Sequence, residues 1–326
     1  MDSTNFVTWY EKPRQVKHMR HKISIIGAGN VGSTTAQGCL QKGLGDVVLL
    51  DIAEGLAKGK ALDLMQMNAL YASSSRVTGT ADYAETANSD VVVVTAGIVR
   101  KPGMSRDDLI ATNKEVVSAV VRSVTRFSPN ASLIIVTNPL DLMCVAALRA
   151  SGLPPKKLIG LSGVLDSIRM RYYIAQAARV PAHTVCGPVL GEHGNSMVPL
   201  PRLATINGVP APALLSQKAL QEICENTVKG GSTITEMMGT SAYYAPGYSI
   251  VVMIEALLND SKAILPCSVY LEGEYGIRDI FMCVPVRLGK DGAEEIIELP
   301  LQSDEAALLA QSAASIRSKL ESAALV

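Results

Sequence analysis

Residues 23–32 of the chain read ISIIGAGNVG, a short apolar run followed directly by the motif G-x-G-x-x-G. We predict a strand for the apolar run and a helix that begins inside the motif. In such a turn Gly27 permits the sharp change of direction, Gly29 lets the main chain approach a diphosphate, and Gly32 lets the helix pack closely on the strand. The free N–H groups at the start of the helix would face the phosphates. The motif therefore predicts a dinucleotide-binding βα unit, with contacts from Gly27, Gly29, Asn30, Val31 and Gly32.

A second apolar run ends in Asp51, nineteen residues after Gly32. A carboxylate at this place accepts hydrogen bonds from the hydroxyl groups of an adenosine ribose, and it would repel a 2′-phosphate. We therefore expect NAD, and not NADP, as the cofactor.

The alternation of strand and helix continues through the N-terminal half of the chain. Apolar runs occur at residues 23–27, 46–51, 90–96, 132–138 and 157–161, and helical stretches at residues 30–43, 54–70, 105–127 and after Pro139. Hydrophobic residues make up 48% of the chain and aromatic residues only 4%, so the apolar content is mostly aliphatic, as in parallel strands buried on both faces. We predict an α/β protein with a doubly wound, parallel Rossmann sheet over residues 21–161.

From residue 162 the pattern changes, which predicts a second, α+β domain over residues 162–326. Its expected elements are a helix at 164–179, a hairpin turn at Asn207-Gly208, a long helix near 233–259 that is kinked or broken at Pro246, extended runs at 264–271 and 281–288, and a final helix from Ser303. Ser303 can cap the final helix, and its apolar stripe would be Leu309, Ala313, Ile316 and Leu320. Residues 1–20 are polar and predict a flexible tail or an arm that docks on a neighbouring subunit.

The overall composition argues against several classes of protein. Lys and Arg total 30, as do Asp and Glu, so the formal net charge is zero; we therefore expect no nucleic-acid or anionic-membrane partner. No apolar run reaches the roughly 18 residues of a membrane span. The six cysteines are scattered without a C-x-x-C pair, which favours free thiols in a reducing, cytoplasmic compartment over disulfides or a zinc site.

Four further segments resemble the lactate/malate dehydrogenase family, and most closely its lactate-dehydrogenase-like malate dehydrogenases. They are TAG at 95–97 with RKPGMSR at 100–106, VTNP at 136–139, VLDSIR at 164–169, and GEHGNS at 191–196 with VPLP at 198–201. The segments occur in the family's order, and the resemblance covers about residues 21–323. It implies reversible hydride transfer between NAD and a small dicarboxylate, with malate and oxaloacetate as the substrate pair.

The resemblance implies a catalytic role for His193 and Asp166. Oxidation of a secondary alcohol needs a base for the hydroxyl proton, and histidine titrates near neutrality. Asp166 would hold the second ring nitrogen of His193, and Arg169 would bind a substrate carboxylate through two parallel hydrogen bonds. The alternative for Asp166 and Arg169 is an i,i+3 ion pair on a helix surface.

The other implied site residues surround a loop rich in glycine and proline. Arg106 would polarise the substrate carbonyl when the loop closes, and Asn138 would position the cofactor and the substrate oxygen. Arg100 would pair with the second carboxylate of oxaloacetate, whereas pyruvate would leave this arginine buried and unpaired. The remaining implied cofactor contacts are Thr95, Ala96, Gly97, Asn113 and Thr137.

Three positions differ from the malate-type pattern. Glu192 stands where malate enzymes of this branch usually have Gly, Asn195 replaces an aspartate, and Val99 replaces a proline. These differences keep a lactate dehydrogenase, or an enzyme that accepts both substrates, as the main alternative. More remote alternatives are an NAD- and metal-dependent glycosidase and a non-catalytic NAD-binding protein. The resemblance also implies a homo-oligomer, a tetramer rather than a dimer, that belongs to the tricarboxylic acid cycle.

Overall fold

The structure, a computed structural model, describes residues 20–98 and 105–325. In the N-terminal half, six parallel strands form a sheet in the order β3-β2-β1-β4-β5-β6. The strands are β1 (Lys22–Ile26), β2 (Asp46–Leu50), β3 (Val77–Thr80), β4 (Val91–Val94), β5 (Ser132–Ile135) and β6 (Leu158–Gly160). The predicted doubly wound sheet is confirmed. Its strand order reverses between β1 and β4, where sheets of this kind bind ligands at the carboxyl ends of their strands.

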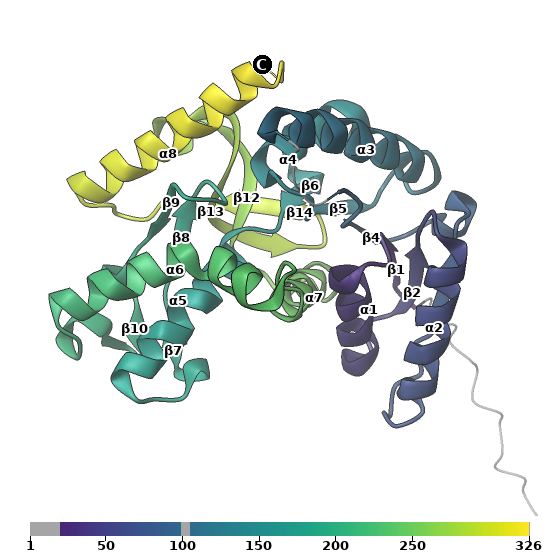
Figure 1. Ribbon diagram of the computed structural model, residues 1–326, viewed down its shortest axis with the longest axis horizontal. Helices are drawn as coiled ribbons and strands as arrows, with labels where there is room; N and C mark the ends of the chain where they lie inside the picture. Colours follow the sequence, from purple (N-terminus) through teal and green to yellow (C-terminus); the bar gives the residue numbers. More distant parts are fainter. Residues whose placement is uncertain (1–19, 99–104, 326) are drawn as a thin grey trace, which may run out of the picture.

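Helices cover both faces of this sheet, which explains why its strands are apolar throughout. The helices are α1 (Asn30–Lys42), α2 (Glu54–Asn68), α3 (Arg106–Phe127) and α4 (Leu140–Ser151). On one face α3 and α4 pack together, and on the other α1 packs against the later helix α7 (Tyr244–Leu258) (Figure 1). Strand β4 is four consecutive valines, all buried, as expected for a strand with two covered faces.

The sheet continues into the C-terminal half through antiparallel strands. Ser268 pairs with Gly160 of β6, and the order then runs β12-β13-β8-β9, with β14 on β13 (Figure 1). These strands are β12 (Ala263–Glu272), β13 (Arg278–Gly289), β14 (Gly292–Ile296), β8 (Val189–Gly191) and β9 (Met197–Pro199), and a small second sheet holds β7 (Val185–Cys186), β10 (Thr205–Ile206) and β11 (Val209–Pro210). The other helices are α5 (Gly163–Ala178), α6 (Gln217–Met238) and α8 (Ser303–Ser322). The predicted combination of a parallel Rossmann sheet with an α+β half is confirmed.

The turn and the final helix agree with most of the predicted detail. Asn207 and Gly208 both have positive φ, 48° and 86°, and join β10 to β11 as a tight hairpin turn. The apolar stripe of α8 is buried at Leu309, Ala313, Ile316 and Leu320. The predicted cap was wrong, because Ser303 is the first residue of α8, and Gln302 forms the cap together with Glu305.

The long helix predicted near 233–259 is two helices, and the break is not at Pro246. Helix α6 begins at Gln217 and ends where Gly239 adopts a left-handed conformation with φ 67°. Helix α7 begins at Tyr244, so Pro246 lies in its first turn. A proline is tolerated there because first-turn N–H groups have no partner inside the helix. Strand β3 was not predicted.

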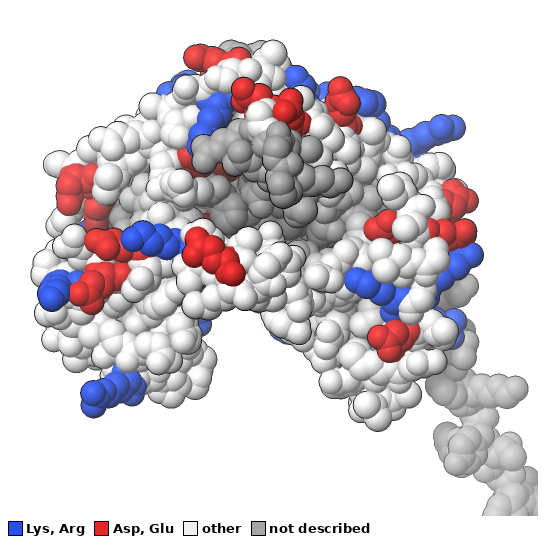
Figure 2. Space-filling view, in the orientation of Figure 1, with Lys and Arg blue, Asp and Glu red and all other residues white. Residues whose placement is uncertain are grey.

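The surface shows no field of a single sign on the face seen in Figure 2, where basic and acidic side chains are interspersed. Over residues 20–98 and 105–325, no helix combines the length and the apolar character needed to cross a bilayer. The segment predicted as a tail or docking arm lies outside the described residues, apart from Arg20.

Candidate active site

The three glycines of the motif follow β1 and extend into the first turn of α1. The surroundings of each explain in a different way why a glycine occupies the position. Gly27 has φ 111°, and a Cβ built there would lie 2.5 Å from Thr95 Oγ1. A Cβ on Gly32 would lie 1.9 Å from the carbonyl oxygen of Gly27, so α1 and β1 pack too closely for any side chain. A Cβ on Gly29 would meet nothing within 4 Å. The space beside Gly29, at the N-terminus of α1, is therefore open to a ligand, and it suits a diphosphate because helix N-termini attract anions.

Asp51 lies next to this loop, directly after β2. Its Oδ2 accepts a hydrogen bond from the Ala28 main-chain N at 2.7 Å, and its Oδ1 accepts one from Ala53 N at 2.9 Å. These contacts orient the carboxylate and leave lone pairs free on both oxygens. A cavity of about 320 Å³ is lined by Asp51 together with Gly27, Gly29, Thr95, Ala96 and Gly97. This arrangement fits the ribose and diphosphate of a dinucleotide.

A second cavity, of about 290 Å³, joins the glycine-loop side to His193. The predicted residues that line it are Val31, Thr95, Gly97, Thr137, Asn138 and His193. Thr95 and Gly97 line both cavities, so the two cavities lie next to each other. Sequence reasoning missed the apolar and small residues that complete this cavity, among them Leu109, Leu161, Leu165, Ser241, Ala242 and Pro246.

Asn113 lines neither of these two cavities. Its side chain is buried, and its Nδ2 donates to the carbonyl oxygens of Ile98 at 3.1 Å and Asn138 at 2.8 Å, while its Oδ1 accepts from Ile98 N at 2.8 Å. Asn113 therefore fastens the end of the Thr95–Ile98 segment to Asn138. Thr137 makes a parallel link, since its Oγ1 donates to the carbonyl oxygen of Ala96 at 2.6 Å.

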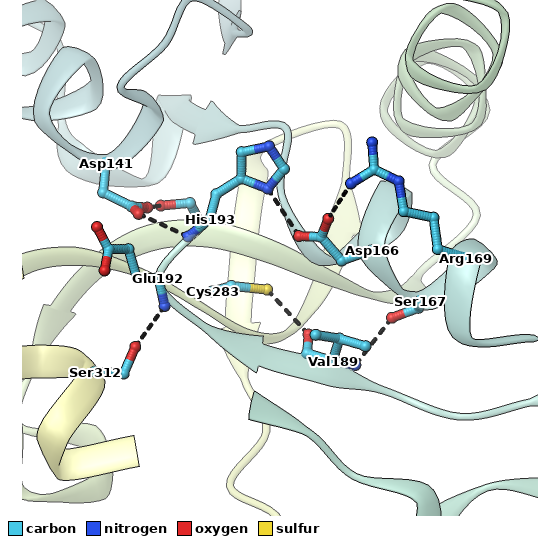
Figure 3. Close-up of polar contacts among 10 residues, drawn as sticks. Asp141, Asp166, Ser167, Arg169, Val189, Glu192, His193, Cys283 and Ser312 are labelled. Atoms are coloured by element: carbon cyan, nitrogen blue, oxygen red, sulfur yellow. Dashed lines mark hydrogen bonds and ion pairs between the residues drawn. The ribbon is translucent and has the colours of Figure 1, made fainter. Parts of the chain in front are cut away.

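One carboxylate holds both a histidine and an arginine at the candidate catalytic centre. Asp166 Oδ2 lies 2.7 Å from His193 Nδ1, and Asp166 Oδ1 accepts from Arg169 Nη1 at 3.0 Å (Figure 3). Asp166 is only 1% exposed, and the side chains of His193 and Arg169 are 15% and 14% exposed. The i,i+3 pair therefore exists, but it is buried and shared with His193. Asp166 also lies in the first turn of α5, where the helix dipole favours a negative charge.

The contact with Asp166 sets the orientation and the charge of His193. A carboxylate accepts hydrogen bonds, so Nδ1 carries a proton and Nε2 is left as the reactive nitrogen. Burial by itself lowers the pKa of His193. The charge and hydrogen bond of Asp166, with the charge of Asp141, outweigh burial and the opposing charge of Arg169, so the pKa of His193 lies above its ordinary value. The site thus stabilises an imidazolium.

The main chain around His193 is held by contacts that sequence reasoning missed. His193 N donates to Asp141 Oδ2 at 3.0 Å, and Glu192 N donates to Ser312 Oγ at 2.7 Å (Figure 3). The carboxylate of Glu192 pairs with Lys319 and accepts from Ser315 Oγ at 2.9 Å. A sequence signal existed for Asp141, which is one acidic residue inside the apolar run LDLMCVAAL of residues 140–148.

Two predicted arginines cannot be placed at the site. Arg100 lies outside the described residues. Arg106 is the first residue of α3, and its side chain is outside what the structure describes. A capping box begins α3: Ser105 Oγ accepts from Asp108 N at 3.0 Å, and Asp108 Oδ2 accepts from Ser105 N at 3.1 Å.

Comparison with known proteins gives matches along almost the whole chain. Residues 21–160 match the model described as "lactate/malate dehydrogenase, NAD binding domain", and residues 163–325 match "lactate/malate dehydrogenase, alpha/beta C-terminal domain". A malate dehydrogenase of Methanosarcina mazei is 48% identical over 304 residues, which are 92% of this chain and 99% of that protein.

Two solved structures share the fold and much of the sequence. The malate dehydrogenase of Salinibacter ruber matches with a TM-score of 0.89 and 44% identity, over 92% of this chain and 97% of that one. The lactate dehydrogenase of Eimeria maxima matches with a TM-score of 0.90 and 38% identity, over 94% and 95%. Both halves therefore lead to the same conclusion: the chain belongs to the lactate/malate dehydrogenase family, whose N-terminal domain binds NAD.

Proposed function

We propose that the chain is an NAD-dependent malate dehydrogenase that interconverts malate and oxaloacetate. The observation that carries the proposal is the buried carboxylate of Asp166, which joins the imidazole of His193 to the guanidinium of Arg169 beside the cavity that Asn138 lines. Two related proteins, from Methanosarcina mazei and Salinibacter ruber, are both named malate dehydrogenase, and they support the choice of substrate.

The glycine loop and the cavities indicate which residues would hold the cofactor. The N-terminus of α1 beside Gly29 would bind the diphosphate, and Asp51 would bind the adenosine ribose. Thr95, Gly97, Thr137 and Asn138 would surround the nicotinamide end, and Asn113 would fix the position of Asn138. When bound, NAD supplies the acceptor for the hydride that leaves the alcohol carbon.

The catalytic residues would then divide the remaining work. His193 Nε2 would accept the hydroxyl proton of malate, and Asp166 would stabilise the resulting imidazolium. In the reverse direction the same imidazolium would donate its proton to the oxygen of oxaloacetate. Arg169 would bind the carboxylate next to the reacting carbon, and its Nε is buried without a hydrogen-bond partner among the described residues. We assign Arg106 to the substrate carbonyl and Arg100 to the second carboxylate, both from the sequence pattern.

The substrate is tested by a paired steady-state assay. We expect kcat/KM with NADH to be higher for oxaloacetate than for pyruvate. The lactate dehydrogenase of Eimeria maxima has the same fold at 38% identity, so pyruvate is the matched comparison. A higher value for pyruvate would overturn the malate assignment while leaving the 2-hydroxy acid dehydrogenase class intact.

We further propose that residues 21–161 are the NAD-binding domain and that residues 162–326 are the catalytic domain of a cytoplasmic homotetramer, which acts in the tricarboxylic acid cycle. The proposal of a tetramer follows from membership of the lactate/malate dehydrogenase family. Light scattering coupled to gel filtration should give four times the mass of one chain; the mass of one or two chains would contradict the tetramer.

A further inference from the structure

A buried carboxylate lies outside the proposed catalytic set. Asp141 belongs to the first turn of α4, three residues after Asn138, and it is 2% exposed. The neighbouring positions of the helix, Leu140 and residues 142–147, are buried and largely apolar. An ionisable group in such surroundings is costly unless hydrogen bonds compensate its lost hydration, so its partners show why it is there.

Asp141 bridges two segments that are distant in sequence. Its Oδ1 accepts from Ser268 Oγ of β12 at 2.6 Å. Its Oδ2 accepts from the main-chain N of His193 at 3.0 Å (Figure 3). The turn that presents Asn138 to the active-site cavity therefore also presents a carboxylate to the histidine loop. Asn138 and His193 both line that cavity, and Asp141 is the direct link between their two segments.

We propose that Asp141 is a positioning residue, which fixes the main chain of His193 relative to Asn138 so that both side chains reach the same substrate oxygen. The inference rests on the proposed function of His193 as the proton acceptor. Asp141 acts through the main chain of His193, and Ser268 holds the second oxygen of the carboxylate in place. A displacement of about 1 Å in such a geometry can lower turnover by about 100-fold.

The charge of Asp141 adds a second, measurable effect. The groups that face its carboxylate are Ser268 on β12, His193 and Glu192 on the histidine loop, and Cys144 on its own helix. Burial raises the pKa of Asp141 to about 6, against the lowering effect of the hydrogen bonds from Ser268 and His193. Its charge also raises the pKa of His193. Removal of the charge should therefore lower the pKa of His193.

Two substitutions at Asp141 separate position from charge. In Asp141→Asn the amide oxygen can accept from His193 N while the NH₂ donates to Ser268 Oγ, so the bridge survives without its charge. In Asp141→Ala the bridge is lost. We expect Asp141→Ala to lower kcat by about 100-fold and Asp141→Asn to recover most of that loss. The Kd for NADH should stay within about twofold of the wild-type value in both variants, since Asp141 is absent from the lining of both cavities.

Further variants and a titration make the test decisive. Val145→Ala removes two buried carbon atoms from the same helix, so it should lower Tm without lowering kcat. If Asp141→Ala does not fold, Ser268→Ala replaces it, with a smaller loss of kcat expected at an unchanged NADH Kd. The pKa of His193, followed by NMR in histidine-labelled protein and assigned with His193→Asn, should fall in Asp141→Asn.

The rates are measured with whichever of oxaloacetate and pyruvate is turned over faster, and the titration needs neither substrate. The test of Asp141 can therefore be interpreted even if the malate assignment is wrong. Wild-type kcat in Asp141→Ala would overturn the positioning role, as would wild-type kcat in Ser268→Ala if that variant has to stand in. An equal loss of kcat in Val145→Ala, or a loss of NADH binding in step with kcat, would also overturn it, because either result indicates a purely structural role.

Discussion

Asp166 Oδ2 lies 2.7 Å from His193 Nδ1, although the two residues are 27 positions apart in the chain. Asp166 lies in the first turn of α5, which follows the last parallel strand, β6, and His193 follows the short antiparallel strand β8. The contact therefore spans the change from the parallel to the antiparallel part of the sheet. Among the charged groups around His193, the buried carboxylate of Asp166 raises its pKa most.

The first prediction is that Asp166→Asn moves the pH profile of malate oxidation to lower pH. Oxidation needs a neutral imidazole, so kcat/KM rises as the pH rises through the pKa of His193. Asp166 raises this pKa, and without its charge the rising limb should shift downwards. The maximum should also fall by about 10²–10⁴-fold, the range of an acid–base contribution. If the rising limb of the Asp166→Asn profile lies at the same pH as in the wild type, Asp166 does not raise the pKa of His193.

Two glycine substitutions should have opposite consequences. The Gly32→Ala variant places a Cβ 1.9 Å from the Gly27 carbonyl oxygen, so we expect a protein that folds poorly or has a much lower Tm. In Gly29→Ala the new Cβ meets no protein atom within 4 Å, so Tm without ligand should be close to wild type while NADH binds more weakly. Thermal scans with and without NADH measure both effects. Unchanged NADH affinity in Gly29→Ala would show that the cofactor does not approach this turn.

Asp51→Ala should narrow the preference for NAD over NADP. The variant loses the ribose partner and the negative charge that repels a 2′-phosphate. We expect KM for NAD to rise and kcat/KM for NADP to rise relative to that for NAD. Because Asp51 also accepts from Ala28 N, Asp51→Asn is the control that keeps an acceptor beside the glycine loop. Equal use of both cofactors by the wild type would refute the ribose argument.

The pair between Glu192 and Lys319 should stabilise the protein in a pH-dependent way. Burial alone raises the pKa of Glu192, but the hydrogen bonds from Lys319 and Ser196 and the charge of Lys319 bring it below its ordinary value. A carboxyl group with a lowered folded-state pKa contributes stability above its unfolded-state value of about 4.3, and loses it as the pH falls through the folded-state pKa.

Lys319→Met should therefore lower the free energy of unfolding at pH 7 by about 1–3 kcal/mol and by less at an acid pH below the folded-state pKa of Glu192. Urea unfolding at the two pH values measures the difference. Lys58→Met is the matched control, because Lys58 pairs with Glu54 in an exposed i,i+4 ion pair that contributes at most about 0.5 kcal/mol. The same loss at both pH values would contradict a role for the charge of Glu192.

Local patterns in the sequence predicted the features that short segments determine. The G-x-G-x-x-G motif predicted β1, the turn and α1, because strand, turn and helix are contiguous. Strand β3 escaped prediction because Val77–Thr80 reads VTGT and lacks an apolar run. The link from Asp141 to Ser268 and the pair of Glu192 with Lys319 each join residues 127 positions apart. Such contacts follow from the packing of α4, β12 and α8, which no local spacing encodes.

The last prediction is that Arg100→Gln changes the choice of substrate. Oxaloacetate would lose the charged partner of its second carboxylate. In a closed site this loss costs about 2–5 kcal/mol, or roughly 30- to 4000-fold in kcat/KM. Pyruvate lacks the second carboxylate, and the variant no longer buries an unpaired guanidinium when pyruvate binds, so its kcat/KM should rise relative to that of oxaloacetate. The ratio of the two kcat/KM values decides the result, because damage to the fold or the loop affects both substrates and cancels.

Arg100→Lys is the matched control, because it keeps the charge but not the planar fork. Its ratio of kcat/KM values should lie between those of the wild type and Arg100→Gln. An unchanged ratio in Arg100→Gln would show that Arg100 does not select the substrate and would remove the main residue-level argument for malate.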